Sequence, residues 1–121
     1  MHETAIVGSL FEIIRAKVAE HKIQKVVRVK LKVGELTAVE PMTLTACFEV
    51  FAEGTVVEGA ELLIEQVPLT GQCGDCSREF RIREFRFRCP ECESTSVEIV
   101  GGKELYIEDM EVQKEQGGNP R

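Results

Sequence analysis

The sequence predicts an α+β fold in which two helices pack on a small, mixed three-stranded sheet, with a cysteine-bearing subdomain inserted before the last strand. Two stretches repeat apolar residues at helical spacing, and three short stretches favour strands. Two Cys-x-x-Cys pairs lie between the second and the third of these strands. A single strand after the cysteines would leave its backbone groups unpaired, so we expect it to return to the sheet.

Helical spacing is clearest near the start of the chain. Residues 4–21 place polar side chains on one side of a helix and apolar side chains on the other. The apolar residues are Ile6, Leu10, Ile13, Ile14 and Val18. We expect Thr4 to cap this helix. A second helix is predicted behind Glu40 and Pro41, because proline is favoured in a first helical turn, and Gly54 is expected to end it. Its apolar stripe consists of Leu44, Cys47, Phe48 and Phe51.

Three segments are predicted as strands, namely residues 25–34, 60–67 and 103–112. In the first segment apolar residues alternate with arginine and lysine, which indicates one buried face. The apolar residues of this alternation are Val27, Val29, Leu31 and Val33. Residues 113–121 have little to bury, so we expect a disordered tail there.

The four clustered cysteines indicate a zinc site. Cys73 and Cys76 form one pair, and Cys89 and Cys92 form a second pair after an interval of twelve residues. Two residues between paired cysteines let both sulfur atoms reach one tetrahedral ion. Four thiolates fill that shell, so no position remains for water or substrate, and the Zn²⁺ would be structural. We therefore predict a zinc-ribbon domain over residues 71–97, inserted into a domain of residues 1–70 and 98–112.

Two other interpretations of the cysteine segment remain open. The cysteines could be free or redox-active thiols, although two pairs at this spacing are typical of zinc ribbons. Residues 79–87 alternate and can form a hairpin, whose arginines and phenylalanines could stack on nucleic acid. Five arginines face four acidic residues within 73–92, so the segment is only slightly basic and solvated arginines are favoured.

Composition and charge narrow the classes of protein. The net charge of −6 over 121 residues argues against a general nucleic-acid binder and against docking on an anionic membrane. No apolar run is long enough to span a membrane, and no signal-peptide layout is present. We therefore expect a cytoplasmic protein, in which five cysteines stay reduced and four of them bind metal.

The first three residues, Met1-His2-Glu3, have a possible chemical use. The α-amine, the amide nitrogen of His2 and its imidazole can form two fused chelate rings on one metal ion. Such nitrogen-rich donor sets suit nickel(II) or copper(II) better than zinc. If these three residues are considered without the rest of the chain, a solvated terminus is their simpler interpretation.

The order of these features resembles the HypA/HybF family of hydrogenase-maturation proteins. The resemblance is carried by Met-His-Glu at the start, the predicted helix, the run Val-Gly-Glu-Leu-Thr-Ala-Val-Glu-Pro over residues 33–41, and the cysteine pairs before a final strand. It covers residues 1–112. Members are nickel metallochaperones that deliver nickel for nickel–iron hydrogenases, together with a GTPase, HypB, and the hydrogenase large-subunit precursor. The resemblance therefore implies Ni²⁺ as transient cargo, and no enzyme activity.

The resemblance also implies a nickel site. The family's ligands fall on His2 and Glu3, with the amine of Met1 sharing the metal. Some members use a further acidic residue that aligns with Glu40, where they have aspartate. Family members occur as monomers and as dimers, so either state is open here.

Certain relatives carry a histidine beside each cysteine pair, which couples zinc ligation to pH or nickel. This chain has Ser77 and Glu93 there, so we do not expect that coupling. Two competing functions remain: a zinc-ribbon module that docks on a nucleic-acid machine, and an enzyme with Cys47 as nucleophile. Cys47 has no histidine near it in the sequence and is expected to be a small core residue.

Overall fold

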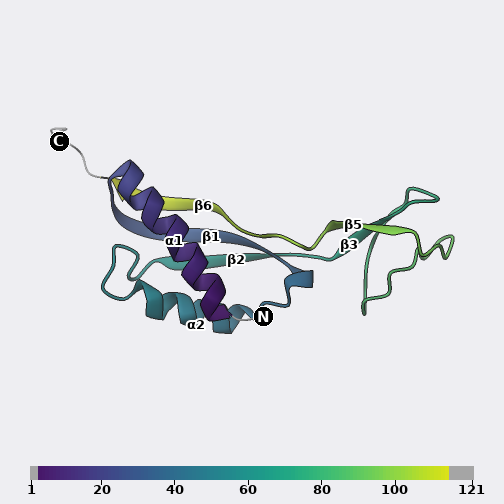
Figure 1. Cartoon of the computed structure of the whole chain (residues 1–121), viewed down its shortest axis with the longest axis horizontal. Coiled ribbons are helices and arrows are strands. Elements are labelled where there is room, and N and C mark those ends of the chain that lie inside the picture. The colour runs from purple at the N-terminus through teal and green to yellow at the C-terminus, as the bar shows by residue number, and fades with distance from the viewer. Residues whose placement is uncertain (1–2, 115–121) are drawn as a thin grey trace. The chain divides into compact units, whose positions relative to one another are not determined.

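The structure, a computed structural model, describes residues 3–114 (Figure 1). Within that range lie two α-helices, α1 (Glu3–His21) and α2 (Pro41–Ala52), and a short 3-10 turn, η1 (Glu35–Thr37). The strands are β1 (Ile23–Gly34), β2 (Glu61–Val67), β3 (Thr70–Cys73), β4 (Glu79–Arg81), β5 (Val97–Gly101) and β6 (Leu105–Lys114). None of the helices in residues 3–114 is both long and apolar enough to cross a membrane.

The chain divides into two compact units. Unit 1 consists of Met1–Leu31, Val39–Ile64 and Tyr106–Arg121, and unit 2 consists of Lys32–Ala38 and Glu65–Leu105. The zinc-ribbon limits of 71–97 stay a prediction.

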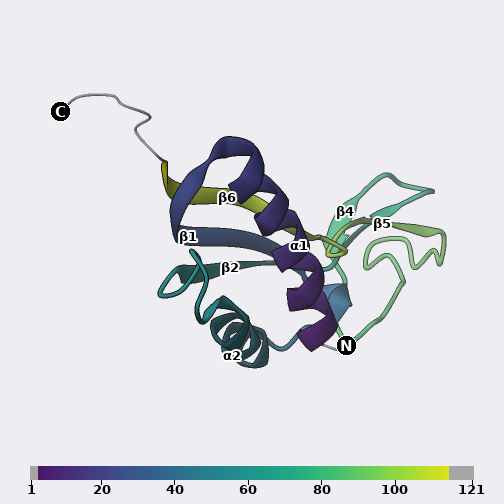
Figure 2. The ribbon, with the colours of Figure 1, turned by 60° about the vertical axis from the view of Figure 1, so that its left-hand side comes forward.

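The core of unit 1 is built on α1, which lies across the sheet (Figure 2). The ring of Phe11 lies 5.2 Å from that of Phe48 and 5.7 Å from that of Phe51, measured between centroids. The buried residues of α1 are Val7, Leu10, Phe11 and Ile14. The prediction that Ile13 belongs to this stripe is wrong, because Ile13 is 51% exposed. Successive helical residues point about 100° apart, so Ile13 turns away where Ile14 packs.

The helix ends follow the sequence in part. Glu40 is the N-cap of α2, and Pro41 occupies its first turn as predicted. Gly54, two residues beyond the last residue of α2, has a φ of 74°, a conformation that glycine adopts at no steric cost. The cap predicted at Thr4 is wrong, because α1 already begins at Glu3 and Thr4 lies within its first turn.

The sheet on which the helices pack has the order β2-β1-β6. Four ion pairs cross it: Arg28–Glu61, Lys32–Glu65, Arg28–Glu111 and Lys30–Glu108. As residue numbers increase along β1, the numbers of the ion-pair partners increase on β2 and decrease on β6. β2 is therefore parallel to β1 and β6 is antiparallel to it, which confirms the mixed three-stranded sheet.

The strand limits differ in detail from the prediction. Val26 is fully buried and Val27 is half-buried, so regular alternation begins only at Val29. β6 runs on to Lys114 and includes two residues that the prediction placed in the tail. The rest of that predicted tail, 115–121, lies outside the described residues.

Unit 2 contains a second sheet, with the order β4-β3-β5, in which β3 is antiparallel to both neighbours. The hairpin predicted over residues 79–87 is wrong. Only Glu79–Arg81 form a strand, and this strand pairs with β3, which precedes the first cysteine turn. β3 and β5 were not predicted, because four or five residues that include glycine carry too little periodicity.

The segment that follows β1 is fixed by a close backbone approach. A Cβ atom added at Gly34 would lie 2.1 Å from the carbonyl of Gly102, so only glycine fits. The N–H of Leu36 donates to that same carbonyl at 2.8 Å. The carboxylate of Glu35 accepts the N–H of Leu69 at 2.8 Å and lies 3.8 Å from the guanidinium of Arg81. The Gly-Glu-Leu part of the run over residues 33–41 thus organises unit 2.

Candidate metal centre

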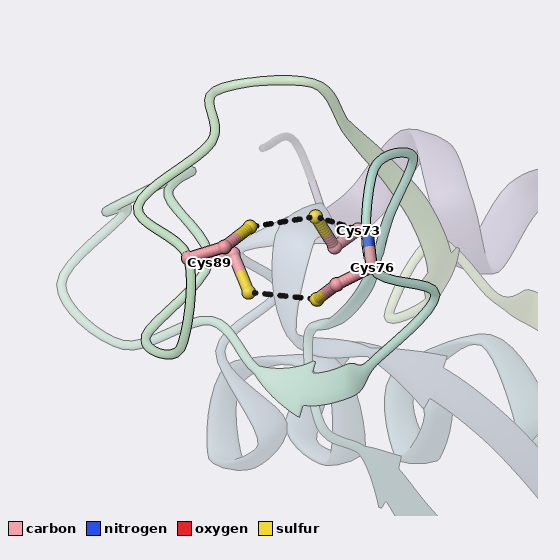
Figure 3. Close-up of side chains that lie close together, drawn as sticks. Cys73, Cys76 and Cys89 are labelled. Atoms are coloured by element: carbon pink, nitrogen blue, oxygen red, sulfur yellow. Dashed lines mark hydrogen bonds between the residues drawn. The ribbon is translucent and has the colours of Figure 1, made fainter.

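The four predicted zinc ligands come together between two turns of unit 2, and Figure 3 labels Cys73, Cys76 and Cys89. All four Sγ atoms of Cys73, Cys76, Cys89 and Cys92 lie within 4.8 Å of one another. The Sγ–Sγ distance is 3.5 Å from Cys73 to Cys92 and 3.6 Å from Cys76 to Cys89. Sulfur atoms bound at about 2.3 Å to a tetrahedral Zn²⁺ would lie about 3.8 Å apart. The cluster therefore fits one zinc ion with little adjustment.

The two turns have the same backbone geometry. In the first turn the N–H of Cys73 donates to the carbonyl of Arg78, and the N–H of Ser77 donates to the carbonyl of Cys73. In the second turn the N–H of Cys89 donates to the carbonyl of Ser94, and the N–H of Glu93 donates to the carbonyl of Cys89. These four hydrogen bonds are 2.9–3.0 Å long. The residue after each pair adopts a left-handed conformation, with φ of 67° at Ser77 and 62° at Glu93. Local sequence thus builds each half of the site separately.

The thiols have unequal acidity. The Sγ atom of Cys73 accepts the N–H groups of Cys76 and Asp75 at 3.4 and 3.3 Å, and these hydrogen bonds lower the pKa of Cys73 to about 6. The backbone N–H of Ser94 lowers the pKa of Cys92. The hydrogen bond between the Sγ atoms of Cys92 and Cys73, together with burial, outweighs this effect and raises the pKa of Cys92 to about 12. Four adjacent sulfur atoms therefore need a cation before all can ionise. Zn²⁺ supplies that charge and prefers thiolates, so the cluster fits a structural zinc.

A pair of carboxylates lies at the starts of α1 and α2 in unit 1. Oε2 of Glu3 accepts the backbone N–H of Glu40 at 3.0 Å. Oε1 of Glu40 accepts both the N–H and the hydroxyl of Thr43, each at 2.8 Å. Glu40 therefore caps α2 with its side chain while its backbone holds Glu3. Met1 and His2, the other predicted nickel ligands, lie outside the described residues.

Both carboxylates of this pair ionise easily. The backbone N–H of Glu40 lowers the pKa of Glu3, and the backbone N–H of Thr43 lowers the pKa of Glu40. Helix starts favour negative charge as well, because their free N–H groups carry partial positive charge. The ionised carboxylate of Glu3 is thus held against the backbone of Glu40, directly after the first two residues of the chain, and offers an oxygen donor for a divalent cation.

Cys47 lies in the middle of α2 and does not resemble a nucleophile. Its Sγ atom is 3.6 Å from the hydroxyl of Thr4, and its side chain is half-buried. A threonine hydroxyl is not a base that could activate a thiol. The expectation of a core residue is met only in part, because Cys47 is half-buried and does not belong to the buried core.

The fold and site together define a small metal-handling protein, in which a closed zinc ribbon accompanies an α+β unit. The family described as "Hydrogenase/urease nickel incorporation, metallochaperone, hypA" matches residues 1–112. The chain therefore belongs to the HypA family, which confirms the resemblance seen in the sequence.

Individual relatives agree with this assignment. The Hydrogenase maturation factor HypA of Desulfitobacterium hafniense is 46% identical over 114 residues, which cover 94% of this chain and all of that protein. The factor of the same name from Geobacter sulfurreducens is 39% identical over 93% of this chain and all of that protein. The solution structure of the Ni metallochaperone HypA from Helicobacter pylori matches with a TM-score of 0.66 and 28% identity, over 95% of this chain and all of that one.

Proposed function

We propose that this protein binds Ni²⁺ through the amine of Met1, His2 and Glu3, with Glu40 as a further candidate ligand. The observation that supports this most directly is the hydrogen bond from the N–H of Glu40 to the carboxylate of Glu3. It holds an ionised oxygen donor immediately after the predicted nitrogen donors, and it brings together two residues that are 37 positions apart. Membership of a nickel-incorporation family makes nickel the expected cation.

The two metal sites would then divide the work. Thiolates on two rigid turns retain zinc, whereas nitrogen and oxygen donors at a chain end bind nickel and can release it. Release would serve nickel–iron hydrogenase maturation, with a HypB-type GTPase and the hydrogenase large-subunit precursor as partners. In this proposal the protein is cytoplasmic and has no catalytic role of its own. The zinc ribbon of residues 71–97 serves folding and positioning rather than catalysis.

The test is a nickel titration by calorimetry on untagged protein that starts at Met1. Two variants accompany it: His2→Ala, and a protein with two residues added before Met1, which converts the amine into an amide. Both should lose specific nickel binding and keep their zinc, because neither change touches a cysteine. Unchanged nickel affinity in His2→Ala would favour the zinc-ribbon module without nickel.

Glu40 needs a separate test, because its carboxylate already caps α2. Glu40→Gln removes the charge but keeps an oxygen that can accept from Thr43. Weaker nickel binding in this variant, at unchanged zinc content, would support direct ligation. Unchanged binding would assign Glu40 a positioning role through its backbone N–H, which the substitution retains.

A further inference from the structure

Unit 2 contains a cavity of about 610 Å³ that is rich in arginine and borders the zinc cluster through Cys89. Its charged lining consists of Arg78, Arg81, Arg83, Arg86, Arg88, Glu79 and Glu93. The half-buried ring of Phe80 and the ring of Pro90 supply apolar surface. Five arginines against two glutamates make this cavity strongly basic, although the chain as a whole has a net charge of −6.

The arginines of this cavity are not all neutralised. Arg78, Arg81 and Arg86 have carboxylates within 4.0 Å, at 3.5, 3.8 and 3.5 Å respectively. Arg83 and Arg88 form no ion pair with any of the residues 3–114. A guanidinium presents a planar fork that matches a carboxylate with two parallel hydrogen bonds. The guanidinium groups of Arg83 and Arg88, which have no ion pair among the described residues, are therefore suited to bind an anionic ligand. The rings of Phe80 and Pro90 add apolar surface to the same lining.

A strained turn joins Arg83 to Arg86, two of the arginines that line this cavity. The N–H of Arg86 donates to the carbonyl of Arg83 at 3.0 Å, and the two central residues, Glu84 and Phe85, have φ of 54° and 56°. This is a type I′ turn, which strongly prefers Asn-Gly at those positions. A bulky residue in the left-handed region is uncommon, and such strain concentrates at functional sites. The turn leaves Phe85 65% exposed, so folding gains little from that ring.

We propose that the surface formed by the arginine cavity and Phe85 is a docking site for an acidic segment of a partner protein. Glutamate or aspartate side chains of that segment pair with Arg83 and Arg88, and an aliphatic or aromatic side chain between them packs on Phe85. A nucleic acid fits less well, because its extended phosphate chain would meet the negative surface of the rest of this protein. Its residues belong to unit 2, whereas the proposed nickel ligands belong to unit 1.

Fluorescence anisotropy of the full, zinc-loaded chain tests this proposal. The probe is a short labelled peptide in which glutamates alternate with leucine and phenylalanine, and the matched peptide has glutamine in place of glutamate. The acidic peptide should bind and should weaken as salt is added. Arg83→Gln/Arg88→Gln should weaken binding roughly tenfold or more. The control Arg15→Gln/Lys25→Gln removes the same charge from unit 1 and should leave binding unchanged.

A second variant separates binding from folding. Phe85→Gly installs the residue that the second central position of a type I′ turn prefers and keeps the ion pair of Glu84 with Arg86, so it should raise the melting temperature while it weakens peptide binding. A purely structural turn would gain stability and lose no affinity. The proposal is overturned if this variant or the arginine variant binds the acidic peptide like the unchanged protein, or if the glutamine peptide binds equally well. Tighter binding of a single-stranded oligonucleotide than of the peptide would assign the surface to nucleic acid instead.

Discussion

The zinc cluster and the carboxylate pair of Glu3 and Glu40 hold charge in different ways. In the cluster, four sulfur atoms lie within 4.8 Å, and the turns that carry them are fixed by their own backbone hydrogen bonds. At the carboxylate pair, a single hydrogen bond joins the two residues, and Glu40 is exposed. The comparison teaches that each half of the thiol cluster is prepared by its own turn, whereas the carboxylate pair depends on a contact between the starts of two separate helices.

The largest effect is expected from breaking the cluster. Replacing Cys73 and Cys89 by serine removes one thiolate from each turn, so zinc should be lost on dialysis and β3–β5 should lose order. Structural zinc contributes on the order of 10 kcal/mol to small domains. Metal analysis and circular dichroism measure this, and the helical signal of α1 and α2 should persist. Cys47→Ser is the control and should keep its zinc; zinc retained in the double variant would contradict the site.

A smaller loss is expected from Gly34→Ala, which strains unit 2 without touching a metal ligand. The new Cβ would meet the carbonyl of Gly102 at 2.1 Å, so the backbones must separate. We expect at least about 2 kcal/mol of destabilisation in thermal or denaturant unfolding. The control is Gly8→Ala in α1, where the nearest atom would be 3.8 Å away. That change should be neutral or stabilising, and equal losses in both variants would contradict the close approach.

The carboxylate pair should reveal itself through pH. The folded protein lowers the pKa of Glu40 below its ordinary 4.5, so its ionised cap stabilises α2 above that pH and the contribution fades as pH falls through the lowered pKa. Glu40→Gln should therefore melt below the unchanged protein near pH 7. The gap in melting temperature should narrow as the pH falls below 4.5 and through the lowered pKa. A gap that stays constant across this range would contradict the charged cap.

The smallest effect is expected from Ser77→Gly, which relieves a left-handed residue beside the cluster. Ser77 has a φ of 67°, a conformation that costs glycine less than serine, so the change should stabilise the ribbon by about 1 kcal/mol. Slower zinc loss to a chelator measures it. Glu93→Gly should stabilise the ribbon in the same way, because the second turn has the same geometry. If one substitution slowed zinc loss and the other accelerated it, the two turns would not be equivalent.

Much of this architecture could be predicted from periodicity. Both α-helices and the three strands of the first sheet were placed within two residues of their limits. The short strands β3 and β5 were missed, because pairing between distant segments stabilises them and local pattern does not. The choice of Phe11 over Ile13 for the core of α1 was missed for a similar reason, since both are apolar and only the position of α2 decides between them.

The sequence by itself determined the cysteine site, because two ligands separated by two residues can be arranged by one turn, whatever surrounds it. Only the tertiary structure decided that Glu3 meets Glu40, that Gly34 faces Gly102, and that five arginines line one cavity. These contacts join residues of separate elements. Their formation depends on how helices and strands pack, and packing reflects the burial of the whole apolar core rather than the spacing of any few residues.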